Sequence, residues 1–254
     1  MLRKLAYGTA IAALLSAGSA QALIVDDFTV GLTGGTTGAG NGACYVEGGC
    51  VLLLTTPGSS VTSISTGSTA NIIGGDRELV LTHTGGAGAV IASVSSAQDS
   101  FSHSNGSGVS GISLLRWDGA GNGGGLDFDL DDGVGAAGYD ITEGGTLSGL
   151  SIKILDADLT NSTMQFRLYN NAGTFVQLAV NPPSGASVFD IDYATIVGVD
   201  LTAITAIELE AIGGDAFDVT IDFIESRVLP EPATLALFGL GLVGVAAMRR
   251  RVKA

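Results

Sequence analysis

The sequence is poor in the residue types that most often carry catalysis. Its 254 residues include two histidines, His83 and His103, and no serine lies in a Gly-x-Ser-x-Gly elbow. A nucleophilic mechanism needs a serine or cysteine beside a histidine base. We interpret both histidines as structural, His83 at the end of a strand and His103 in a polar loop, and predict that the protein is not an enzyme. A secreted hydrolase with paired carboxylates is the weakest alternative, because nothing selects a pair among 25 acidic residues.

Basic residues are also scarce between the two ends of the chain. Residues 23–232 contain five lysines and arginines, whereas all 25 acidic residues fall in this stretch. This part is therefore more acidic than the whole chain, whose formal net charge is −14. Such a surface repels nucleic acid and anionic lipid, so nucleic acid is excluded as a partner. The charge favours solubility in an exported protein, and cation binding is the alternative.

Helical periodicity is missing before residue 233, while glycine is abundant. The chain has 39 glycines and 5 prolines, and its apolar residues are too frequent for a disordered chain. Short apolar or alternating segments between glycine turns predict strands. The predicted strands cover residues 23–30, 51–56, 74–82 with a leading turn, 89–94, 109–117, 126–133, 147–155, 163–170, 174–180, 187–193, 204–212 and 217–225. This spacing predicts one all-β sandwich or jelly roll.

Three of these segments give predictions of local structure. The two strands within 163–180 are separated by Asn170-Asn171-Ala172-Gly173, which predicts a hairpin. Residues 126–133 alternate apolar and acidic side chains, which predicts a strand with its apolar side turned inward. Residues 99–108 are rich in serine and glycine and are expected to form a loop.

The N-terminus has the features of a secretory signal peptide. Arg3 and Lys4 precede a small, apolar run at 10–17, and Ala20-Gln21-Ala22 provides a cleavage site for signal peptidase. We expect cleavage after Ala22. The apolar run is too short for an uncleaved anchor.

The two cysteines lie close together in the exported part. Cys44 and Cys50 flank a segment that contains the turn Gly48-Gly49. An even number of cysteines in an exported chain predicts a disulfide. A metal site is the alternative, but two ligands without a nearby histidine do not complete a zinc shell.

The C-terminus begins with a proline-rich triplet and continues with an apolar stretch. The triplet is Pro230, Glu231 and Pro232, and no charged residue occurs from 233 to 248. A helix over this stretch is about 24 Å long, which is short for a bilayer core of about 30 Å. We predict a transmembrane span over about 233–248, with snorkelling flanks or local thinning of the membrane.

A basic cluster closes the chain, formed by Arg249, Arg250, Arg251 and Lys253. Basic residues beside a membrane span stay in the cytoplasm. The acidic domain is therefore expected on the far side of the membrane from the cytoplasm. At each end of the chain, the basic residues lie between the apolar segment and the terminus. Both ends therefore predict the same orientation, with the termini in the cytoplasm and the domain on the far side.

In this order, the triplet, the span and the basic cluster resemble the bacterial PEP-CTERM sorting signal, here at 229–254. The resemblance implies export, transient anchoring in the inner membrane, and cleavage near the Pro-Glu-Pro triplet by an exosortase, a membrane-embedded cysteine transpeptidase. It also implies a bacterium that makes extracellular polysaccharide. A plain single-span tail anchor is the alternative.

Short segments of the domain resemble a recurrent PEP-CTERM ectodomain pattern, and through it the jelly rolls of carbohydrate-binding modules. These segments are Val25–Phe28, Gly75–Glu78, Leu126–Leu130 and Ala206–Leu209. The resemblance implies a structural calcium ion where the terminal strands meet, held by Asp26 or Asp27 and by Asp222. No other cofactor is expected.

The single tryptophan is the candidate for a sugar-binding platform. Trp117, with Asp118 and the nearby Tyr139, would contact a glycan if the indole were exposed. A core or edge position of Trp117 is the alternative, because it lies at the end of a predicted strand.

These observations predict an exported surface or extracellular-matrix protein without enzymatic activity. It is expected to have a signal peptide at 1–22, a β-sandwich ectodomain at 23–228 and a sorting signal at 229–254. Its expected partners are signal peptidase, exosortase, the inner membrane transiently, and extracellular polysaccharide. A carbohydrate-binding module is the alternative function.

Overall fold

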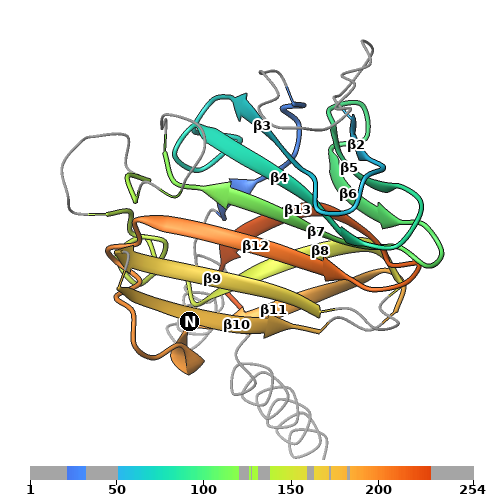
Figure 1. Cartoon of the computed structure of the whole chain (residues 1–254). Helices are drawn as coiled ribbons and strands as arrows, with labels where there is room; N and C mark the ends of the chain where they lie inside the picture. Colours follow the sequence, from blue (N-terminus) through green and yellow to red (C-terminus); the bar gives the residue numbers. More distant parts are fainter. Residues whose placement is uncertain are drawn as a thin grey trace, which may run out of the picture.

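The chain folds as two β-sheets that lie one over the other, as Figure 1 shows. This computed structural model describes residues 22–32, 51–119, 126, 128–130, 138–158, 163–171, 173–181 and 184–229. Within these residues the single helical element is a short 3-10 turn, η2 (Tyr193–Thr195). The predicted all-β sandwich is therefore confirmed.

One sheet has seven strands, all paired in antiparallel fashion. Its strands, in spatial order, are β11 (Ser187–Asp192), β8 (Gly149–Asp158), β13 (Asp218–Arg227), β6 (Ser100–Asn105), β5 (Val90–Ser95) and β2 (Val51–Leu54), and β1 (Leu23–Asp26) also pairs with β13. The first and last strands of the domain are thus neighbours in the interior of the sheet, with Leu23 opposite Ser226.

The second sheet has six strands and is also antiparallel. Its strands, in spatial order, are β10 (Thr174–Val180), β9 (Thr163–Asn171), β12 (Ala206–Gly213), β7 (Ser110–Trp117), β4 (Asp76–Gly85) and β3 (Ser60–Thr66). Strands β9 and β10 form the hairpin that the sequence predicts, with Phe166 opposite Leu178.

The core lies between the two sheets, because alternate residues of most strands point inward. Strand β7 shows this pattern: Leu115 and Trp117 are buried, whereas Leu114 and Arg116 on the other face are partly exposed. Both sheets contribute to one continuous apolar cluster. Its largest fully buried apolar side chains are Trp117, Phe28, Phe101, Phe166 and Phe217.

A fully buried ion pair ties the first strand to the six-stranded sheet. The Nη1 of Arg77 on β4 donates to both carboxylate oxygens of Asp26 on β1, at 2.8 and 2.7 Å. The indole of Trp117 and the backbone N–H of Phe28 also donate to this carboxylate, each at 2.8 Å. Burial raises the pKa of Asp26, although Arg77 and the hydrogen bonds oppose this effect. Neither charged side chain has any exposed surface.

The predicted strand over 126–133 is wrong for its described residues. None of Leu126, Phe128, Asp129 and Leu130 belongs to a strand. Phe128 has a φ of 63°, in the left-handed region that a strand does not use. The N–H groups of Asp129 and Leu130 donate to loop carbonyls instead, that of Asp129 to the carbonyl of Asp118. The alternating pattern is present, but the described residues of this segment pair with loops and not with a strand.

The predicted loop over 99–108 is wrong in its first half, which is strand β6, whereas residues 106–108 lie outside any strand. This strand lies between β5 and β13, and its polar side chains Ser100, His103 and Asn105 are buried. His103 is therefore not solvated: it is 1% exposed, and its Nδ1 lies 2.5 Å from Ser113 Oγ. Strand β3, which no sequence pattern predicted, is built in the same way from serine, threonine and apolar residues.

The buried His103 predicts a loss of stability in mild acid. Burial lowers the pKa of His103 from 6.5 to about 4, an effect that the Asn105 side chain partly opposes. The folded state therefore binds this proton less readily than the unfolded state, and stability falls as the pH drops from 6.5 toward 4. Between pH 7.5 and 5.0 we expect His103 to account for about 2 kcal/mol of lost unfolding free energy.

Urea denaturation of the wild type and of His103→Gln at the two pH values measures this contribution. The variant should lose less stability between them than the wild type does. Equal losses in both proteins would show that the histidine ring does not titrate in this way.

Several predictions concern residues outside the described part of the chain. These are the signal peptide before Ala22, the Cys44–Cys50 disulfide, the Pro230-Glu231-Pro232 triplet, the 233–248 span and the basic cluster after it. Among the residues that are described, no helix has the length and apolar character that crossing a membrane requires.

Candidate functional site

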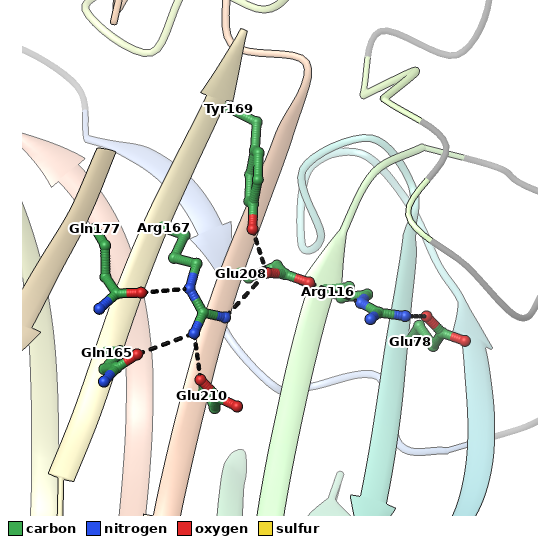
Figure 2. A network of polar contacts seen from close by, with 8 residues as sticks. All are labelled: Glu78, Arg116, Gln165, Arg167, Tyr169, Gln177, Glu208 and Glu210. Atoms are coloured by element: carbon green, nitrogen blue, oxygen red, sulfur yellow. Dashed lines mark hydrogen bonds and ion pairs between the residues drawn. The ribbon is translucent and has the colours of Figure 1, made fainter. Parts of the chain in front are cut away.

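The outer face of the six-stranded sheet has a row of polar side chains that crosses five strands (Figure 2). The strand register places Glu78, Arg116, Glu208, Arg167 and Gln177 opposite one another in sequence across β4, β7, β12, β9 and β10. Their chain neighbours point into the core, so the two-residue period of a strand turns this row outward. We call it the polar row.

Arg116 links the carboxylates on its two sides. Its Nε donates to Glu208 Oε1 at 2.8 Å, and its Nη1 donates to Glu78 Oε2 at 2.9 Å. Both carboxylates are almost fully buried, and Arg116 is 20% exposed. Although burial opposes it, the two glutamates raise the pKa of Arg116. The guanidinium therefore stays charged.

Arg167 forms the second centre of the network, with four partners. Its Nε donates to Gln177 Oε1 at 2.9 Å, and its Nη1 donates to Glu208 Oε2 at 3.2 Å. Its Nη2 donates to Gln165 Oε1 at 2.9 Å and also to Glu210 Oε2. Every nitrogen of this side chain thus has a fixed partner, which gives Arg167 a single orientation on the sheet.

An aromatic group adjoins the polar row at the β9–β10 end. The hydroxyl of Tyr169 donates to Glu208 Oε2 at 2.6 Å, and burial together with that carboxylate raises the pKa of Tyr169. Its ring stacks on Phe175 with centroids 5.2 Å apart and meets the edge of Phe128 at 5.7 Å. Phe175 is 49% exposed. The network therefore positions an aromatic surface that reaches solvent.

The charged groups of the polar row and of Glu210 pair with one another. The carboxylates of Glu208 and Glu210 and the guanidinium groups of Arg116 and Arg167 are engaged with one another. Among the described residues, no group of three or more His, Cys, Asp or Glu side chains is placed to hold a metal ion.

The structure places Trp117 in the core and not on the surface. Its side chain has no exposed area, and its indole N–H is directed at Asp26. Trp117 therefore cannot serve as an exposed sugar platform. The hypothesis of a sugar site at Trp117 is wrong, and the alternative of a core position is correct. Asp118 is almost fully buried, and Tyr139 is half-buried against the core and bridges to Ile204.

The three aspartates of the predicted calcium site do not form a common ligand set. Asp26 is engaged by Arg77. Asp27 accepts from Asn71 at 2.7 Å and from Thr29, and Asp222 pairs with Lys153. The terminal strands do meet, as expected, but each carboxylate has a protein partner of its own.

The last described residue, Leu229, directly precedes the predicted sorting triplet and is held by the fold. The N–H of Leu229 donates to Ser148 Oγ at 2.9 Å. The Leu229 side chain lies so close to Gly149 that a Cβ there would be 2.2 Å from it. The described structure therefore holds the chain up to the residue before Pro230.

The polar row was missed at the sequence level. Its members Arg167 and Glu208 occur in period-two patterns with other polar residues, Gln165-x-Arg167-x-Tyr169 and Glu208-x-Glu210. These patterns indicate outward side chains on strands. The patterns do not reveal the pairing register of the strands. Only that register shows that Glu208 lies between Arg116 and Arg167.

The fold and its outer face define an all-β sandwich with a polar surface network. Its C-terminal segment matches the PEP-CTERM protein-sorting motif over residues 228–251. The tail thus carries the sorting motif that the sequence predicted. This match begins at Val228, one residue before the last described residue, Leu229.

Three solved structures resemble the sandwich at low identity. The family 11 carbohydrate-binding module of the cellulosomal cellulase Lic26A-Cel5E of Clostridium thermocellum is 10% identical, with a TM-score of 0.34, and the alignment covers 84% of this chain and 98% of that one. The solution structure of CtCBM11 is 15% identical, with a TM-score of 0.36, over 85% and 99% of the two chains.

The third is the family 11 module from Clostridium thermocellum in complex with a β-1,3-1,4-mixed-linked tetrasaccharide, 11% identical with a TM-score of 0.32, over 83% and 97% of the chains. At identities and TM-scores this low, the likeness says nothing of what the present chain binds. A comparison with curated proteins gave no match.

Proposed function

We propose that this is a non-enzymatic protein of the cell surface or extracellular matrix, sorted by an exosortase in a bacterium that produces extracellular polysaccharide. The observation that carries the proposal is the sorting motif at 228–251. The buried positions of His83 and His103 support the non-enzymatic part, because neither ring is available as a base at the surface.

The proposed route has two cleavages. Signal peptidase removes residues 1–22, and the span at 233–248 holds the chain in the inner membrane with the basic cluster in the cytoplasm. Exosortase then cuts near Pro230-Glu231-Pro232, where the prolines keep the chain extended. Because the fold holds Leu229, the enzyme has to work directly beside the folded domain.

The mature protein is expected to begin near Leu23 and to end near Pro230. Intact-mass measurement of the protein from the host surface tests both ends. In a host without exosortase, the full C-terminal tail should remain in the inner-membrane fraction. Replacing the triplet Pro230-Glu231-Pro232 by three alanines should have the same effect as deleting the enzyme, since the apolar span is unchanged.

A matched control variant replaces Val252 by alanine, beyond the span and outside the triplet, and should be processed normally. Surface protein that retains Arg249 to Lys253 in a host with exosortase would show that the tail is only an anchor. The sorting proposal would then be wrong.

A further inference from the structure

One aromatic ring stands out on the described surface. Phe175 on β10 is 49% exposed, and the other exposed large apolar side chains among the described residues are aliphatic. It lies on the outer face of the six-stranded sheet, at the end of the polar row, because β10 turns Phe175, Gln177 and Ala179 outward.

The ring of Phe175 is held in one orientation. One of its faces stacks on Tyr169 at 29° between planes, and Tyr169 is itself fixed by its hydrogen bond to Glu208. Phe128 meets Tyr169 edge-on from another side. A rigid aromatic ring loses little conformational freedom when a ligand covers it. Phe175 therefore offers a preformed platform.

Directional polar groups lie next to this platform. Gln177 is two residues further along β10 on the same face, and Arg167 fixes its carbonyl end by donating to Oε1. The amide nitrogen of Gln177 has no acceptor among the described residues. Gln165 is oriented by Arg167 in the same way. A ligand chain that runs from the ring along the strands, past Gln177 to Gln165 opposite Ala179, therefore meets amide groups whose geometry is already set.

The charge of this region selects against acidic ligands. Glu78, Glu208 and Glu210 outnumber Arg116 and Arg167, and the whole chain has a formal charge of −14. Both guanidinium groups already have carboxylate partners, so they offer little to an anion. A neutral ligand with an apolar face and many hydroxyl groups fits the combination of ring and amides.

We propose that Phe175, Gln177, Gln165, Arg167 and Tyr169, here called the Phe175 face, bind a neutral polysaccharide. The C–H face of one sugar ring would cover Phe175, and hydroxyl groups of the following sugar units would bond to the two amides, since Gln177 and Gln165 lie two and four residues along the strands from the Phe175–Tyr169 pair. This site takes the place of the predicted sugar site at Trp117, whose side chain is buried. The proposal does not depend on exosortase processing, so each can fail without the other.

Affinity electrophoresis of the mature protein in gels that contain a soluble polysaccharide tests the site. The neutral probes are mixed-linkage β-glucan, xyloglucan and galactomannan, and alginate is the anionic probe. At least one neutral polymer should retard the protein, whereas alginate should not. Phe175→Ala should weaken binding by roughly tenfold or more, and Gln177→Ala by a smaller factor.

Val188→Ala is the matched control, because Val188 is also 49% exposed but lies on β11 of the other sheet. Circular dichroism should show that all variants are folded, and this control should bind like the wild type. The proposal is overturned if no neutral polymer retards the protein, if alginate binds better, or if Phe175→Ala binds as well as the wild type. Sedimentation that shows Phe175→Ala dissociating a dimer would assign the ring to self-association instead.

Discussion

Replacing Arg77 with methionine is expected to lower the free energy of unfolding by about 3–5 kcal/mol, the range for breaking a buried ion pair. The substitution keeps much of the side-chain volume but leaves the buried Asp26 carboxylate without its cation. Val30 and Ser65, which also accept hydrogen bonds from Arg77, lose their donor. Urea denaturation of the mature protein at neutral pH measures the change.

Two further variants define what that loss means. Arg227→Met breaks ion pairs that are a third exposed and should change stability by about 1 kcal/mol or less. Adding Asp26→Asn to Arg77→Met should recover part of the loss, because it removes the uncompensated charge. If Arg77→Met costs no more than Arg227→Met, the buried pair does not hold the first strand in place.

Glu208→Ala is expected to destabilise the protein by about 3 kcal/mol. Glu208 is 5% exposed and accepts hydrogen bonds from Arg116, Arg167 and Tyr169. Without it, both guanidinium groups lose a close partner and the Tyr169 hydroxyl loses its acceptor. The loss should appear in urea denaturation and should be larger than that of any other single change in the polar row.

Glu210→Ala is the matched control, since Glu210 lies on the same strand but is 16% exposed, and among the described residues its side chain pairs with Arg167 alone. It should cost about 1 kcal/mol or less. Equal effects of the two substitutions would contradict the central position of Glu208. The Glu208 variant should also bind neutral polysaccharide less well, because Glu208 fixes Tyr169, whose ring stacks on Phe175 from the neighbouring strand.

The strands that could be predicted were those whose apolar residues mark a buried face. Strands β9 and β10 and their turn were found because apolar residues alternate on both sides of Asn170–Gly173. Strands β3 and β6 were missed because serine, histidine and asparagine fill many of their positions. Such residues are typical of loops, and only their partners in neighbouring strands satisfy them when buried.

The candidate site was harder to predict than the fold. As the single tryptophan, Trp117 was the candidate sugar platform, but its N–H donates to Asp26 inside the core. Phe175 is one of 9 phenylalanines and has no local feature that separates it from the others. Its exposure follows from the place of β10 at the sheet edge, which depends on the order of all six strands.

The position of β13 determines how the fold would carry a mechanical load. A protein held by its C-terminal end is pulled at Arg227, and the force runs along β13. Strand β8 lies on one side of it, with β6 and β1 on the other. The hydrogen bonds on both sides of β13 must therefore break together under load. Those of an edge strand could break one by one. A domain that is pulled through this interior strand would therefore resist unfolding under load.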